Sequence, residues 1–519
     1  MGLNEILSRT YPSLDGYLSR ASNPVLWIFL IGTVIRLLLL PLTNVDSIDW
    51  YHTAENIISG NGLYTRTGYF YGPLFGYVLS VPIMLTTMIF DFGTFSEFSS
   101  DMIALQEYFT FKPALQTVEF LAVFKIMMVV GDMICAFLVR WFILYLTQDQ
   151  KKADLGFACT YLSPIIFIES GIHGMFDIYC GILALLSVYF AIKGKYFFCG
   201  IAWTMATLMK IFPAFLLPVL VAYILRKNKG DLNKILLDLG LAVIGGITIF
   251  LILYYPQMAY GTFEESWSYL FGRVSKAVEL VGKHWLLAIL GVVALIVLTY
   301  LVIKYVPPEK RTIRLTAKRS IIIMLGLVAL VFLGLVSVTG GVGGMFDNLF
   351  YTSYLLGVVV QGVALLISFY LGYKLYHSKS EDDTKLLIMV GTLAMASSFL
   401  WVPMPEYLIL IIPIIVVYAM TYDRRYLNPY LLISFGAAFF IIMVEGPMAL
   451  FVSVGGYFGI PPMDWVISLT EFYMSGPMIG NYSVLQVVFC AIGAAAQLIG
   501  VILLFVYRFR PFRMEVYRI

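Results

Sequence analysis

Long runs of apolar residues, separated by short polar segments, follow one another along almost the whole chain. Each run is near the ~20 residues that a helix needs to cross the bilayer core. Lys and Arg cluster in several of the short segments, which predicts that those segments lie on the cytoplasmic side. Between two such clusters the chain must cross the membrane an even number of times. This gives about fourteen crossings in all, with both termini inside. The predicted spans are 24–42, 118–146, 153–169, 175–192, 196–209, 212–225, 236–255, 285–304, 320–339, 351–373, 386–402, 407–421, 428–446 and 485–507.

The apolar run at 71–90 does not fit this count. A crossing there would place Lys151 and Lys152 on the outside. We therefore predict that 43–117 forms a first outer loop and that 71–90 dips into the outer leaflet or lies along it. A hairpin formed with 95–117 would keep the same parity.

Composition supports the same class. Of the 519 residues, 60% are apolar and 13% are charged, whereas soluble domains average about 45–50% and about 25%. The net charge of +3 is too small to indicate nucleic acid binding. The five cysteines lie in or beside apolar runs without the spacing of a metal site, and the first apolar run is long enough to remain as an anchor. We predict an all-α polytopic membrane protein with one domain over 1–519.

The first outer loop begins with "NVDSIDWYHTAENIISGNGLYTRTGYFYGPLFG", residues 44–76, the most polar stretch among the apolar runs. Asp46 and Asp49 are three residues apart, so a helical turn would place both on one face. A carboxylate at the membrane boundary acts as a general base when its surroundings raise its pKa toward the working pH. The alternative is that both carboxylates cap a helix that begins near Asp49.

The stretch "ESGIHGMFD" ends one predicted span and begins the next, and it places Glu169, His173 and Asp177 at the outer surface. His52 and His284 are assigned to the same side. Three histidines on one face favour a shared polar cavity, although a histidine at a helix end is commonly a hydrogen-bonded turn residue.

Lys210, in "LMKIFPAFLLP", lies in the middle of about thirty apolar residues, which predicts two short helices broken at Pro213. Neither helix would span the bilayer, so Lys210 lies below the outer surface, within the protein. An intramembrane Lys is costly unless it is paired, and it is a functional candidate by default. An anionic phosphate is one partner; the alternative is a salt bridge to a neighbouring carboxylate.

Two further sets of polar residues lie in or beside apolar runs. Lys125 and Asp132 are seven residues apart on one helical face, which favours a structural ion pair or links to other helices. Glu406 and Tyr407, in "WVPMPEYLILIIP", lie at an outer helix junction. Tyrosine is common at that depth, so Glu406 is the unusual residue.

These motifs, in this order, resemble the GT-C superfamily of integral-membrane glycosyltransferases. Within it the chain is similar to the lipid-phosphate-mannose-dependent mannosyltransferases that act on GPI anchors. The resemblance covers 40–220 well and the remainder loosely. Its motifs are Asp46 followed by "AENIISGNGLY", then "FYGPLF", "FKIMMVVGDMICAFLVR", "KIFP" and, in the later part of the chain, "PEYLILIIP". The family has Asp-x-Asp where this chain has Asp46-x-x-Asp49, which leaves open which carboxylate is the base.

The resemblance implies a GT-C-like bundle with a catalytic core over 1–225 and variable helices over 226–519. It implies transfer of a sugar, mannose by preference, from a polyprenyl-phosphate donor to a glycan or glycolipid hydroxyl, with inversion, on the non-cytoplasmic face of the plasma membrane or endoplasmic reticulum. No metal or cofactor is predicted. The predicted catalytic residues are Asp46 and Asp49. The predicted donor-phosphate ligands are Lys210, His173 and Arg66. The predicted substrate-binding residues are Tyr64, Tyr69, Tyr71, Asp177, Glu406 and Tyr407.

Two other classes of function stay open. A transporter or flippase of lipid-linked sugar would be expected to show internal repeats and paired broken helices, whereas this chain shows one broken pair and no visible repeat. A non-catalytic membrane subunit of a glycosylation complex would explain the same polar groups without any reaction.

Overall fold

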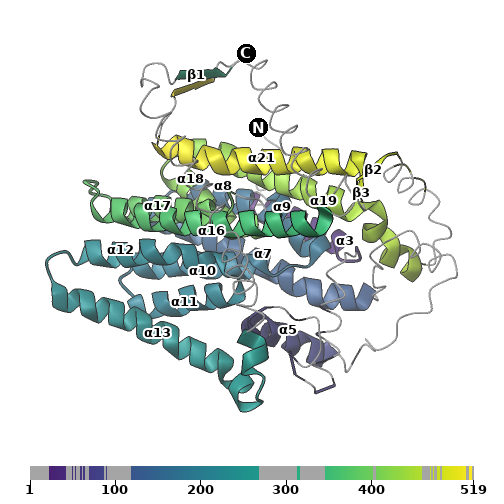
Figure 1. Ribbon diagram of the computed structural model, residues 1–519, viewed down its shortest axis with the longest axis horizontal. Helices are drawn as coiled ribbons and strands as arrows, with labels where there is room; N and C mark the ends of the chain where they lie inside the picture. Colours follow the sequence, from purple (N-terminus) through teal and green to yellow (C-terminus); the bar gives the residue numbers. More distant parts are fainter. Residues whose placement is uncertain are drawn as a thin grey trace, which may run out of the picture.

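The computed structural model is a bundle of helices, most of which run in roughly the same direction (Figure 1). The structure describes residues 23–42, 50, 53, 56, 59–60, 62–64, 69, 71–86, 89, 118–267, 312–315, 345–400, 405–458, 468, 472, 476–479, 482–509 and 513–516.

The helices fall into an N-terminal and a C-terminal group. The N-terminal group is α3 (Pro24–Leu39), α5 (Pro73–Thr86), α7 (Val118–Thr147), α8 (Gln150–Tyr161), α9 (Pro164–Ile168), η2 (Glu169–His173), α10 (Asp177–Ile192), α11 (Tyr196–Met209), η3 (Phe212–Leu216), α12 (Leu217–Lys227) and α13 (Leu232–Ala259). The C-terminal group is α16 (Met345–Tyr376), α17 (Asp383–Ser397), η5 (Pro405–Ile411), α18 (Ile412–Thr421), η6 (Arg424–Tyr426), α19 (Leu427–Phe458) and α21 (Val484–Phe509).

Four short strands accompany the helices. β1 (Thr312–Leu315) pairs in parallel with β4 (Arg513–Val516). β2 (Met478–Ile479) pairs with β3 (Tyr482–Ser483) in an antiparallel hairpin. These ribbons of two to four residues leave the architecture helical.

Several helices are long and apolar enough to cross a bilayer. Among the described residues these are Glu119–Thr147, Leu232–Ala259, Arg424–Val444 and Val484–Arg508, and a fifth is obtained if Gln150–Tyr161 and Pro164–His173, bent by 43°, form one span. The prediction of a polytopic helical membrane protein is confirmed. Each predicted span on described residues coincides with a helix or with consecutive helices, while 285–304 and 320–339 lie outside the described residues.

The apolar segment at 71–90 forms the short helix α5. Its 14 residues measure about 21 Å at ~1.5 Å per residue, less than the ~30 Å hydrocarbon core. It packs against α7 and α11. α5, like α11 with the same number of residues, is therefore shorter than the hydrocarbon core is thick.

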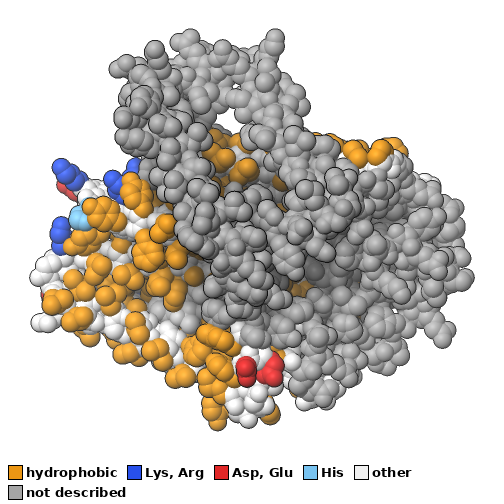
Figure 2. All heavy atoms as spheres, in the orientation of Figure 1, with side chains coloured by type: hydrophobic (Ala, Val, Ile, Leu, Met, Phe, Trp, Pro, Cys, Tyr) orange, Lys and Arg blue, Asp and Glu red, His pale blue; other side chains and the backbone are white. Residues whose placement is uncertain are grey.

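The centre and the edge of the bundle differ in burial. Every residue of α18 from Ile412 to Met420 is buried, as expected for a helix that is apolar on all sides. α13 lies at the edge, where Val243, Ile247 and Ile252 are more than half exposed. Figure 2 shows apolar side chains spread over this side of the molecule, which is the surface expected to face lipid acyl chains.

Two basic loops meet at one end of the bundle. Arg226, at the end of α12, pairs with Asp383 of α17 at 2.7 Å and donates to the carbonyl oxygens of Ser378 and Ser380 at 2.5 Å each. Lys and Arg side chains gather at this end, on the left of Figure 2. The loops 226–234 and 374–385 therefore lie on the same side of the bundle.

Candidate functional site

A break between α11 and α12 places Lys210 inside the protein. α11 ends at Met209, Lys210 is extended (φ −145°, ψ 141°), and η3 follows. Pro213 lies in the first turn of η3. A proline is tolerated there because the N–H that it lacks would have no partner within the helix and because its fixed φ suits helical geometry. The prediction of two short helices broken near Pro213 is confirmed.

Neighbouring segments cover the broken end of α11. The Cys180 thiol donates to the Ala206 carbonyl oxygen at 3.1 Å, and the Trp203 indole donates to the Pro213 carbonyl oxygen at 2.9 Å. Gly72 lies so close that a Cβ at this position would be 2.0 Å from the Leu208 carbonyl oxygen. Only glycine permits this approach.

Lys210 is paired with a carboxylate inside the chain. Its Nζ lies 3.1 Å from Oδ1 of Asp177, and the two side chains are 5% and 0% exposed. The rings of Tyr407, Tyr71 and Phe176 surround the same Nζ at 4.1, 5.0 and 5.2 Å from their centroids, distances at which an aromatic face attracts a cation. The structure thus shows the carboxylate pairing that we gave as the alternative to a phosphate.

A second buried pair lies one turn before Asp177. His173 Nδ1 is 2.8 Å from Glu169 Oε2, and both side chains are buried. The two residues delimit η2, a π-type turn, which ends at Gly174 with φ 70°. This left-handed backbone conformation at the end of a helix favours glycine. A Cβ at Gly174 would also be 2.4 Å from the Phe124 ring.

Glu406, from η5, adds a third carboxylate, which interacts electrostatically with Glu169, Asp177 and Lys210. It is 5% exposed. We call the set Glu169, His173, Asp177, Lys210 and Glu406 the buried polar cluster. Its members come from η2, the start of α10, the end of α11 and η5, so it joins four elements.

The tyrosines of the first outer loop mostly hold that loop together. The Tyr64 hydroxyl donates to the Tyr71 carbonyl oxygen at 2.7 Å. The Tyr69 hydroxyl donates to the Gly72 carbonyl oxygen and accepts from the Gly76 N–H, both at 2.7 Å. Tyr71 also reaches the cluster, since its ring lies over Lys210.

The remaining predicted site residues cannot be placed with the cluster. Asp46, Asp49 and Arg66 lie outside the described residues. Within the parts of the chain that the structure describes, no group of three or more His, Cys, Asp or Glu side chains has an arrangement that could hold a metal ion.

Other buried charges link helices, as expected for Lys125 and Asp132. Asp132 Oδ2 is 2.6 Å from Arg36 Nε, and both side chains are fully buried. Arg36 also donates to the carbonyl oxygens of Tyr161 at 2.8 Å and Gly32 at 3.0 Å. Lys125 donates to backbone carbonyl oxygens, including that of Leu42. These bonds fasten α3 to α7 and α8; the sequence pattern did not show Arg36 as the partner of Asp132.

Comparison with known proteins gives one family. Residues 102–280, about a third of the chain, match the family model PIG-U, described as GPI transamidase subunit PIG-U. The matched segment contains four of the five residues of the buried polar cluster, all but Glu406. No curated protein matches the chain at a significant level.

This match overturns the predicted identity. The resemblance to GT-C glycosyltransferases, the mannosyltransferase activity and the polyprenyl-phosphate sugar as partner are wrong, because the matched family is a transamidase subunit and no glycosyltransferase family matches. The short motifs misled because Pro at a helix break and Tyr near the membrane surface are common in membrane proteins of many families. Of the classes we considered, the match supports the non-catalytic membrane subunit of a complex.

Proposed function

We propose that this chain is a non-catalytic membrane subunit of a GPI transamidase complex, and that its partners are the protein subunits of that complex. The observation that carries the proposal is the family match over residues 102–280. Three buried polar pairs of the described residues have at least one member in that segment: Arg36–Asp132, His173–Glu169 and Lys210–Asp177.

The pairing of these charges within the chain favours a structural role. Lys210 and Asp177 form an ion pair inside the protein, although Oδ2 of Asp177 and Oε1 of Glu169 accept no hydrogen bond from the described residues. Here the Lys210 ammonium faces a carboxylate and three aromatic rings. Such a cluster fixes the relative positions of the helices that contribute to it, which is what a membrane scaffold for other subunits requires.

The test is depletion of the protein in its host cell, followed through a GPI-anchored reporter. We expect the reporter to keep its uncleaved hydrophobic C-terminal tail, because transamidation removes that tail as the anchor is attached. The lipid anchor precursor should accumulate in complete form, as measured by mass spectrometry of extracted glycolipids. A truncated precursor that lacks a sugar would contradict the proposal, because it would indicate a missing sugar transfer. Tagged protein should also co-purify with the other transamidase subunits. If the tagged protein is recovered from mild detergent without those subunits, the proposed role in the complex is contradicted.

We further propose that the chain crosses the membrane about fourteen times, with both termini in the cytoplasm and the buried polar cluster toward the non-cytoplasmic side. The two basic loops that meet through Arg226 and Asp383 support a cytoplasmic placement of that end. Lys193 and Lys195 lie in the loop between α10 and α11. Asp177 and Lys210, from the cluster, lie at the opposite ends of these two helices.

Cysteine labelling tests this topology. Cysteine introduced at Glu264, an exposed position just after α13, should react with a membrane-impermeant thiol reagent applied to the non-cytoplasmic face. Cysteine at Ser380, an exposed position in a basic loop, should react only after the membrane is permeabilised. The unmodified chain controls for its own cysteines. Reaction of Ser380→Cys from the non-cytoplasmic face would reverse the orientation.

A further inference from the structure

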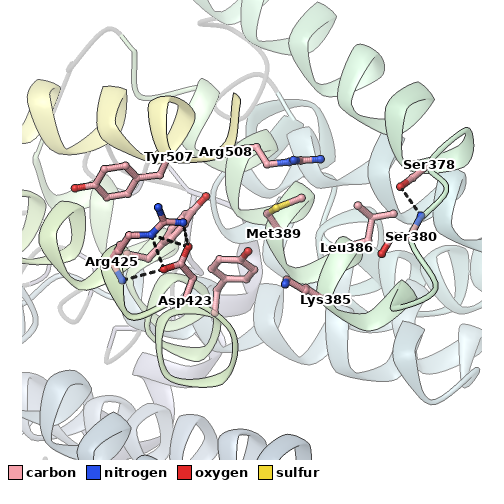
Figure 3. Close-up of a pocket in the computed structure, with 11 residues that line it drawn as sticks. Ser378, Ser380, Lys385, Leu386, Met389, Asp423, Arg425, Tyr507 and Arg508 are labelled. Carbon is pink, nitrogen blue, oxygen red and sulfur yellow. Dashed lines mark hydrogen bonds and ion pairs between the residues drawn. The ribbon is translucent and has the colours of Figure 1, made fainter. Parts of the chain in front are cut away.

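A cavity of about 500 Å³ opens at the basic end of the bundle, between α17, η6 and α21. Three basic residues line it, one from each of these elements: Lys385, Arg425 and Arg508. Figure 3 shows their side chains around that of Met389. No residue of the buried polar cluster lines the cavity.

The lining of this cavity is positively charged. Asp423 is its one acidic residue, and Arg425 engages it through Nη2–Oδ2 and Nε–Oδ1 contacts of 2.7 and 2.9 Å. The Arg425 hydrogen bonds lower the pKa of Asp423, so the carboxylate stays ionised and holds Arg425 in place. Among the described residues that line the cavity, three are basic and one is acidic.

The lining of the cavity is mostly polar, and its apolar members contribute little of its surface. Leu386, Met389 and Tyr426 are buried, while Lys385 and Arg508 are exposed. Both basic residues stand at the end of an apolar helix, Lys385 near the start of α17 and Arg508 in the last turn of α21. A mostly polar lining that carries three basic residues at helix ends matches a ligand with a phosphate group.

We propose that this cavity binds a phosphate-bearing headgroup, in the manner of the basic pockets between membrane helices that hold anionic lipids. Its volume falls within the range of small-molecule sites. A lipid in the adjoining leaflet and a soluble phosphate ester share this chemistry, and the experiment below separates them. The proposal does not depend on the function proposed for the whole chain.

The test is native mass spectrometry of the purified full-length protein, titrated with phosphatidic acid and, separately, with phosphatidylcholine. Wild-type protein should bind phosphatidic acid more tightly than phosphatidylcholine. Each Lys or Arg near an anionic lipid contributes about 1 kcal/mol, so Lys385→Gln/Arg508→Gln should weaken that binding about 30-fold. The matched control is Lys379→Gln/Arg424→Gln, which removes the same charge at two exposed positions outside the cavity and should bind as wild type does.

Further outcomes decide the source of the phosphate and the fate of the proposal. If glycerol 3-phosphate binds and displaces phosphatidic acid, and if the cavity variant loses both, the ligand is a soluble phosphate ester. If only the lipid binds, the ligand comes from the membrane. Ser380→Glu places a carboxylate at the cavity and should weaken binding in the same way. Equal affinity for phosphatidic acid in the cavity variant and its control would overturn the proposal.

Discussion

Lys210→Met is expected to destabilise the protein by about 3–5 kcal/mol, because it leaves a buried carboxylate without its cation. The Asp177 side chain is fully buried, and Lys210 lies 3.1 Å from it. Methionine fills much of the same volume, so the lost charge dominates the effect. The measurement is the thermal unfolding midpoint of the protein in detergent.

A double variant and a surface pair sharpen this test. Lys210→Met/Asp177→Asn removes both charges and should recover a large part of the loss, as expected when the cost arises from an unpaired carboxylate. Arg140→Met breaks an ion pair with Asp154 whose side chains are 28% and 20% exposed, and should cost only about 0–1 kcal/mol. If Lys210→Met were as stable as Arg140→Met, the pair with Asp177 would not stabilise the fold.

Gly245→Val is expected to separate α13 from α11. A Cβ at Gly245 would lie 2.1 Å from the Phe197 carbonyl oxygen, and one at Gly200 would lie 1.9 Å from the Ala242 carbonyl oxygen. The two helices therefore touch through backbone, as small residues allow in membranes. A side chain that meets backbone cannot be relieved by a rotamer change, so we expect a cost of about 3 kcal/mol, the upper part of the usual range for overpacking.

Hydrogen exchange over α13 measures this separation. α13 packs mainly against α11, so its amides should exchange faster in Gly245→Val. Gly240→Val is the matched control on the same helix, because nothing lies within 4 Å of a Cβ at that position. Faster exchange in both variants would trace the effect to helix propensity and would contradict the contact we describe.

Local features of this fold could be predicted from sequence, and distant contacts could not. The break at Lys210 followed from a Pro and a Lys within one apolar run, and the helices followed from the lengths of such runs. The partner of Asp132 is Arg36, 96 residues away. The approach of Glu406 to Glu169 depends likewise on how separate helices pack. No local pattern contains that information.

The predicted site illustrates the same limit. Part of the predicted site is brought together in the structure, since His173, Asp177, Lys210 and Glu406 lie in one cluster. Their chemistry depends on whether Lys210 faces a carboxylate of the chain or an external phosphate. That choice is set by the packing of α10 against α11, which spacing along the chain does not reveal.

The covered end of α11 has a consequence for how the protein is made. Its last carbonyl groups lack helical donors, and a lipid environment offers them none, so they depend on surrounding protein. Gly72 and the start of α5 supply part of that cover against Leu208. Because a ribosome produces residue 72 well before residue 208, the covering segment already exists when the broken helix enters the membrane.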